Sequence, residues 1–196
     1  MSTLNSQPVS VLTDVTVEDE VVTSSPARMA LAALRIAFGL TFLWAFFDKL
    51  LALGFHTGYG QDGTLDRFGD AAWINGGSPT EGFLSFGVNP DSPFASFYNN
   101  LAGYVVVDWL FMLGLLGIGL TLTLGAGIRL GAISGFAMYL FMYGAVMLPE
   151  NNPVFDDHLI GAIAMVVLAL TLAGDTWGLG KAWAKTHLVR TYGVLR

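Results

Sequence analysis

Four stretches of the chain are apolar over most of their length, and polar or glycine-rich segments separate them. A helix that crosses a bilayer needs about 20 predominantly apolar residues. The pattern therefore predicts an all-α fold: an integral membrane four-helix bundle with spans at about 27–53, 103–124, 129–148 and 153–174. Together these spans form one expected membrane domain over residues 26–176.

The segment 54–102, between the first two expected spans, is too polar and too rich in glycine to cross a membrane. Loops of this length without secondary structure are uncommon in compact domains, so we expect short helices within it. Residues 78–81 (Ser-Pro-Thr-Glu) have the pattern of a capping box, and Ser92 with Pro93 repeats the helix-start signal. The prediction is a long, partly helical outer loop, which is a candidate lid.

The two ends of the chain differ in character. Residues 1–25 are polar and acidic, which predicts a disordered tail. Residues 177–196 combine tryptophans with lysines and arginines, which is typical of an interfacial amphipathic helix. Most of the basic residues next to the spans lie on the side of the two termini, so the positive-inside rule predicts that both termini are cytoplasmic.

Composition supports the membrane assignment and excludes several functions. Hydrophobic residues make up 54% of the chain, charged residues only 12%, and the mean hydropathy is +0.59. The net charge of −6 is not that of a nucleic-acid-binding protein, which would carry a basic face. The chain has no cysteine, which excludes disulfides, catalytic thiols and thiolate-ligated iron–sulfur clusters.

The start of the last span is the most informative stretch. Asn152 is a good N-cap and Pro153 suits the first helical position, so the span is expected to begin there. Asp156, Asp157 and His158 then fall in its opening turns. Acids near a helix N-terminus are favoured by the helix dipole, so one interpretation is a well-capped helix end. The other is a functional site, because ionisable residues in membrane segments are costly and often functional.

In the predicted topology, three helices that are far apart in sequence bring ionisable groups to one outer layer. The first span ends there, and the second and last spans begin there. The candidate catalytic residues are Asp48, Lys49, Asp108, Asp157 and His158. The alternative is that charges collect at the wet ends of helices without any function.

Reduction of a quinone needs two electrons and two protons, so its site needs hydrogen-bond donors and a proton relay. His158 beside Asp156 or Asp157 would supply such a relay, because histidine titrates in the right range. The candidate cofactor is menaquinone or ubiquinone. Apolar walls are available from three side chains, whose alternative role is packing or lipid contact: Trp44, Phe47 and Trp109.

Arg35 lies about two turns beyond Arg28, inside the first span. A charge at such a position costs at least ~2.5 kcal/mol unless it snorkels or is paired. Arg35 is therefore either a snorkelling side chain or a structural or cofactor-binding residue.

Several of these motifs, taken in order, resemble the DoxX family. They are residues 35–39 (Arg-Ile-Ala-Phe-Gly), Trp44 through 48–50 (Asp-Lys-Leu), 125–129 (Gly-Ala-Gly-Ile-Arg) and 152–158. The long first loop, with 73–79 and 82–84, and the later 149–153 are similar to the DoxD-type subunit of thiosulfate:quinone oxidoreductase.

The resemblance implies a four-helix protein of the prokaryotic plasma membrane, with a role in quinone-linked sulfur oxidation or in resistance to redox stress. It implies activity like that of thiosulfate dehydrogenase (quinone), with a small anionic sulfur substrate and a second oxidoreductase subunit or a homo-oligomer as partner. Two other functions stay open: a non-catalytic anchor or assembly partner in the lipid bilayer, and a small transporter that uses Arg35 and Lys49 as charge stations.

Overall fold

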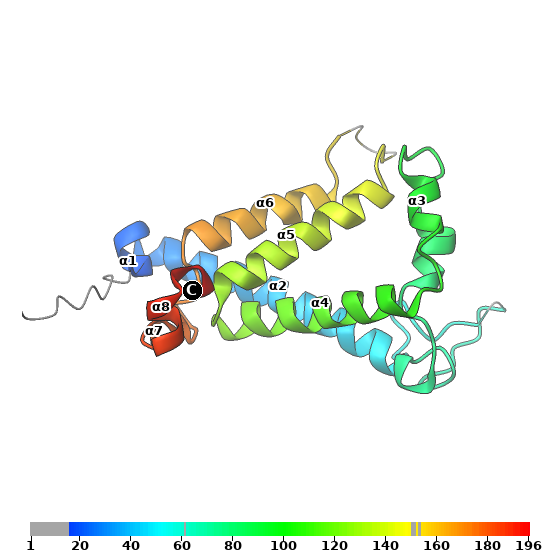
Figure 1. The fold of residues 1–196 in the computed structure, drawn as a ribbon, viewed down its shortest axis with the longest axis horizontal. Helices are drawn as coiled ribbons and strands as arrows, with labels where there is room; N and C mark the ends of the chain where they lie inside the picture. Colours follow the sequence, from blue (N-terminus) through cyan, green and yellow to red (C-terminus); the bar gives the residue numbers. More distant parts are fainter. Residues whose placement is uncertain (1–15, 61, 150–151, 153) are drawn as a thin grey trace, which may run out of the picture.

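The computed structural model describes residues 16–60, 62–149, 152 and 154–196. Within these ranges the chain is helical, without strands; Tyr59 and Leu65 form one isolated β-bridge. The four longest helices are α2 (Ser25–Leu51), α4 (Val105–Leu124), α5 (Ile128–Ala145) and α6 (Asp157–Leu170). They run alternately along the long axis, so α1 (Glu18–Val21) and the C-terminal segment lie at the same end of the molecule (Figure 1).

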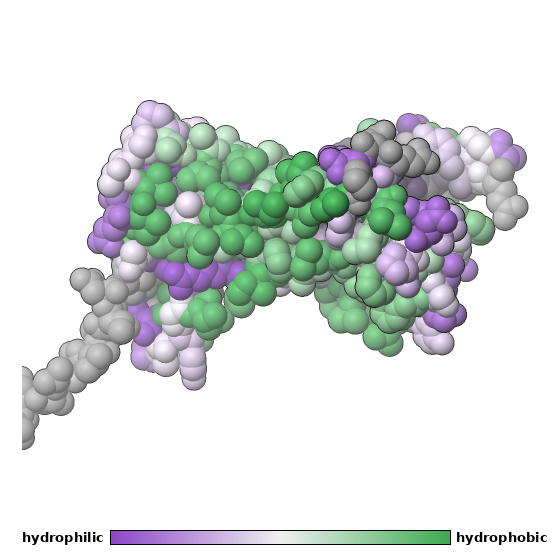
Figure 2. All heavy atoms as spheres, turned by 90° about the horizontal axis from the view of Figure 1, so that it is seen from above, coloured by the Kyte–Doolittle hydropathy of each residue, from purple (hydrophilic) through white to green (hydrophobic). Residues whose placement is uncertain are grey.

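Three of these helices, α2, α4 and α5, are long and apolar enough to cross a membrane. The fourth, α6, has 14 residues, or about 21 Å of helix at 1.5 Å per residue. Hydrophobic side chains cover most of the face between the two ends, and hydrophilic side chains gather towards the ends (Figure 2). The three long apolar helices are therefore compatible with a multi-pass membrane protein.

One hydrophobic core joins all four helices. It contains Phe42 and Phe46 from α2, and the other three helices contribute the following side chains: Met112, Leu115, Ile118, Leu122, Ile128, Ala132, Met165 and Leu168. Glycines on α5 allow the close packing. A Cβ on Gly135 would lie 2.9 Å from Met165 Sδ, and one on Gly131 would clash with Thr121 Oγ1.

The prediction for the start of the last helix is wrong. Pro153 lies outside the described residues, and α6 begins at Asp157 with Asp156 as its N-cap. The Asn152 side-chain oxygen accepts hydrogen bonds from the N–H groups of Val154 (2.9 Å) and Phe155 (3.0 Å), so it closes a turn before the helix. Two residues with good capping side chains follow each other closely here, and the second one, Asp156, caps the helix.

The predictions for the two ends of the chain also need correction. Residues 177–196 do not form one helix: α7 (Gly180–Ala184), α8 (His187–Thr191) and the 3-10 turn η3 (Gly193–Leu195) fold back on one another. Thr186 caps α8 and so interrupts a continuous helix. At the other end, residues 16–24 are not a disordered tail, because α1 packs against the protein with Glu18 fully buried.

The long loop contains short helices, as predicted: η1 (Trp73–Asn75), the π-turn η2 (Phe83–Gly87) and α3 (Ala95–Asn99). The serines of the two predicted start signals bond to the backbone just before these helices, but the N-caps are Gly82 and Phe94, without side-chain cap bonds. Ser78 Oγ accepts a hydrogen bond from Glu81 N–H (3.1 Å), and Ser92 Oγ accepts one from Phe94 N–H (3.2 Å).

Candidate functional site

Asp48 lies in the last turn of α2 and is almost fully buried. Its carboxylate accepts hydrogen bonds from the N–H groups of Phe55 (3.0 Å) and His56 (3.1 Å). Ala52 ends the helix in the left-handed conformation, with φ of 50°, and this turns the chain back towards the carboxylate. Asp48 therefore fixes the start of the long loop.

Asp108 plays the corresponding role at the start of α4. It is buried, and its Oδ1 accepts hydrogen bonds from the Thr80 hydroxyl (2.6 Å), the Ser78 hydroxyl (2.8 Å) and Thr80 N–H (3.2 Å). A buried carboxylate must be paired or hydrogen-bonded, and here the donors come from the loop. Asp108 therefore holds the middle of the loop against α4.

His158 is held by Asp156 at the start of α6. Asp156 Oδ1 accepts a hydrogen bond from Leu159 N–H (2.9 Å), and Oδ2 lies 2.6 Å from His158 Nδ1. One carboxylate thus caps the helix and orients the imidazole. Asp157, the other candidate partner, is exposed at the first helical position. Asp156 is therefore the carboxylate that pairs with His158. Asp157 is adjacent to His158 on the helix, and adjacent helical residues point in different directions.

An aromatic residue that the sequence did not single out lies beside this pair. The ring centroid of Tyr139 on α5 is 6.4 Å from that of His158. Phe38 and Phe42 from α2 meet Tyr139 edge-on, at 6.1 and 5.4 Å. Gly161, one turn into α6, leaves room for the tyrosine: a Cβ there would lie 2.7 Å from its ring. The His158 site therefore combines α2, α5 and α6.

A second tyrosine on α5, Tyr143, contacts the connection before α6. The Tyr143 hydroxyl donates a hydrogen bond to Val154 O at 2.6 Å. It lies four residues after Tyr139, about one helical turn nearer the end of α5. The spacing of the two tyrosines was the available signal, but an apolar helix face rich in aromatics is usually a packing surface.

The remaining predicted residues lie at the same end of α2 and α4. Lys49 is partly buried and has no ion-pair partner within the described ranges. Trp44 and Trp109 are about half exposed and meet loop aromatics edge-on: Phe55 at 4.7 Å and Trp73 at 4.7 Å. Phe47 is also half exposed on α2. These side chains form the outward surface of the helices.

The predicted residues therefore lie at one end of the bundle but in separate places. Across residues 16–60, 62–149, 152 and 154–196, no hydrogen bond or ion pair joins Asp48, Asp108 and His158. Over the same ranges, no group of three His, Cys, Asp or Glu side chains is arranged to hold a metal ion. What the end of the bundle does contain is one histidine–carboxylate pair and two loop-binding carboxylates.

Arg35 is fully buried and makes five hydrogen bonds to backbone carbonyls. Its Nε donates to Ala173 O (2.8 Å), and the two terminal nitrogens donate to the following oxygens: Leu122 O, Thr123 O, Thr176 O and Trp177 O. Because a guanidinium has five N–H groups, none remains for a ligand. Arg35 ties α2 to the end of α4 and to the turn after α6 and neither snorkels nor faces a cofactor.

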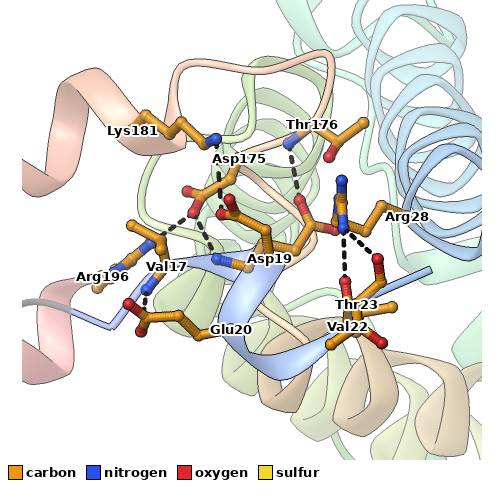
Figure 3. Close-up of polar contacts among 11 residues, drawn as sticks. Val17, Asp19, Glu20, Val22, Thr23, Arg28, Asp175, Thr176, Lys181 and Arg196 are labelled. Atoms are coloured by element: carbon orange, nitrogen blue, oxygen red, sulfur yellow. Dashed lines mark hydrogen bonds and ion pairs between the residues drawn. The ribbon is translucent and has the colours of Figure 1, made fainter. Parts of the chain in front are cut away.

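A buried polar network that includes Thr176, a partner of Arg35, lies at the end that carries α1 and the C-terminus (Figure 3). Asp175 and Arg196 form a buried ion pair of 2.6 Å, and Glu18 N–H donates to the same Asp175 oxygen at 2.9 Å. Glu18 Oε2 accepts a hydrogen bond from Thr176 N–H at 2.8 Å. Burial raises the pKa of Glu18, and the negative charge of Asp175 adds to the effect. The sequence showed no sign of this network.

Comparison with known proteins adds no relative: no family model, curated protein or solved structure matches this chain.

Proposed function

We propose that this chain is a multi-pass membrane protein of the DoxX type. All four long helices cross the membrane in this proposal, with both termini in the cytoplasm and the 54–102 loop outside. The alternating direction of the helices and the apolar surface between their ends support it. The shorter α6 is continued by the apolar turn at 171–174, which adds to its span.

Within that class, the proposed activity is that of a quinone-linked oxidoreductase subunit, similar to the DoxD-type subunit of thiosulfate:quinone oxidoreductase. The observation that carries this proposal is the 2.6 Å pair of His158 Nδ1 and Asp156 Oδ2. A carboxylate at Nδ1 fixes the imidazole orientation and leaves Nε2 to exchange a proton. Nε2 has no hydrogen-bond partner in the part of the chain that the structure describes.

The residues around His158 fit a quinone headgroup. Tyr139 on α5 carries a hydroxyl donor beside the imidazole of His158, and Phe38 and Phe42 supply apolar rings next to Tyr139; the Tyr143 hydroxyl is already bonded to Val154 O. Apolar walls with a few placed polar groups are typical of cofactor sites. Menaquinone and ubiquinone share the two carbonyls that such donors would bind.

The proposed reaction balances with a reduced sulfur anion as the electron donor. Two thiosulfate ions lose two electrons as their sulfur atoms join in tetrathionate, and this oxidation takes place on a partner subunit. A bound quinone would accept those two electrons together with two protons. His158 would pass both protons from Nε2, one after the other, with Asp156 orienting the imidazole, and its partly exposed side chain would be reprotonated from water between the two transfers.

The test is the quinone content of the purified protein, measured by mass spectrometry. His158→Gln and Asp156→Asn are expected to lower the amount of copurified or rebound quinone several-fold. The matched control is Asp157→Asn, which removes an exposed carboxylate from the same helical turn. Unchanged quinone content in His158→Gln would overturn the proposal.

A second candidate function is a non-catalytic anchor for a partner oxidoreductase. It is favoured by the way Asp48 and Asp108 use their carboxylates, because both hold the long loop in place. In that case a partner recovered in mild detergent would be lost when loop residues are replaced, and no quinone would copurify with the chain.

A further inference from the structure

The part of the long loop from η2 to α3 crosses the end of the bundle. Figure 1 shows α3 turned across the direction of α4 and α5, beside the end of α5. A segment in that position lies parallel to the membrane plane if α4 and α5 cross the membrane. The role inferred for this segment rests on that proposed membrane placement.

One side of this segment is bonded to the end of α5. The Ser92 hydroxyl donates to Gly144 O (2.7 Å), and the Tyr98 hydroxyl donates to Phe141 O (2.6 Å). Asn89 donates from its backbone N–H to Ala145 O at 3.0 Å. The last carbonyls of a helix have no partner within the helix and must find one elsewhere. The segment is therefore a fixed cap on α5.

The segment also exposes large aromatic rings. Phe86 is 90% exposed, and Phe94 and Phe97 are about half exposed. Asp91 is the single charged residue between 82 and 104. These rings are exposed on a backbone that is fixed by hydrogen bonds. Exposed apolar groups of this kind indicate contact with an apolar environment outside the fold.

The exposed rings continue onto the surface of the membrane-length helices. The ring of Phe97 lies 6.5 Å from that of Phe141 on α5, which is itself partly exposed. Tyr104 and Val105 then carry the exposed apolar surface from the loop onto α4. The same environment that covers α4 and α5 therefore reaches the loop.

We propose that residues 83–99 form an interfacial anchor, with Phe86, Phe94 and Phe97 inserted among the lipids of the outer leaflet. The occupant of this surface is the boundary between acyl chains and headgroups. Interfacial segments bury an apolar face that carries Trp, Phe or Leu at this boundary. The polar side of the segment faces α5, so the anchor also sets the depth of the bundle.

The absence of cysteine allows a direct test with single nitroxide labels in phosphatidylcholine vesicles. Labels at Phe86→Cys and Phe97→Cys are expected to collide with oxygen more than with a water-soluble nickel complex. The matched control is Asp91→Cys in the same segment, where the ratio of the two collision rates is expected to be several-fold lower. Leu113→Cys, on the exposed face of α4, gives the value for lipid.

The outcomes separate this inference from the membrane placement on which it rests. If Phe86→Cys resembles Asp91→Cys while Leu113→Cys reports lipid, the anchor is wrong and the membrane placement stands. If Leu113→Cys also reports water, the membrane placement fails. A label at position 86 that is shielded from both reagents would show that protein covers the surface, which also overturns the anchor.

Discussion

The Thr80 hydroxyl donates a hydrogen bond to Asp108, with 2.6 Å between Oγ1 and Oδ1, and so joins the middle of the long loop to the first turn of α4. Two further donors, Thr80 N–H and the Ser78 hydroxyl, share the same carboxylate oxygen. Hydrogen bonds to a charged group contribute about 1.5–3 kcal/mol each. This relationship makes Asp108 the point that positions the loop.

Replacement of Asp108 by alanine is expected to release the loop. The three donors from Ser78 and Thr80 lose their acceptor, and the expected loss of stability is about 2–4 kcal/mol. Asp108→Asn keeps an acceptor oxygen and is expected to lose about 1 kcal/mol. Thermal unfolding in detergent and the rate of chymotrypsin cleavage within 54–102 measure the two effects. Asp91→Asn, an exposed change in the same loop, should alter neither; equal cleavage rates for all variants would contradict the role of Asp108.

Much of the fold follows from the apolar pattern. The stretches that predicted the first three spans correspond to α2, α4 and α5, because long apolar runs between glycine-rich turns leave few alternatives. The start of α6 was less predictable. Asn152 and Asp156 are both good caps, and local rules do not show which side-chain oxygen is used for a turn.

The site was only partly predictable for a related reason. The sequence predicted a pair of His158 with Asp156 or Asp157, and the structure places Asp156 in contact with it. Tyr139 could not be assigned in the same way, since its role depends on how α5 packs against α6. The burial of Glu18 is a tertiary contact with Asp175 and Thr176, more than 150 residues away, which a polar terminal stretch does not reveal.

Arg35→Lys is expected to destabilise the protein by at least about 2 kcal/mol. An ammonium group has three donors in place of five, so at least two of the carbonyls now bonded to Arg35 would lose their partners. A buried acceptor without a partner costs about 1–3 kcal/mol. The midpoint of thermal unfolding in detergent is the measurement. Arg190→Lys, at an exposed position, is the control; a similar midpoint for both variants would show that Arg35 does not tie the helices.

Gly125→Ala is expected to be destabilising because of the close approach of two turns around Arg35. Gly125 has φ of +73°, and a Cβ there would lie 2.7 Å from Gly174 O. A left-handed conformation at a residue other than glycine costs about 1–3 kcal/mol. Gly117→Ala is the matched control, because it lies on α4 with open space around it and should raise stability by up to about 1 kcal/mol. Opposite shifts in the unfolding midpoint are expected, and a rise for Gly125→Ala would refute the close packing.

Docking of α1 is expected to weaken as the pH rises. Burial raises the pKa of Glu18 above the 4.5 of a free side chain, so the docked state binds a proton more tightly than the released state. The proton-linked stabilisation is therefore complete below pH 4.5 and is lost as the pH rises through the higher pKa of the docked state. A nitroxide at Val21→Cys, an exposed position on α1, should become more mobile over that range. Glu18→Gln should remove the pH response and Asp19→Asn, which breaks only the exposed contact with Lys181, should keep it. An unchanged response in Glu18→Gln would assign the titration to another group.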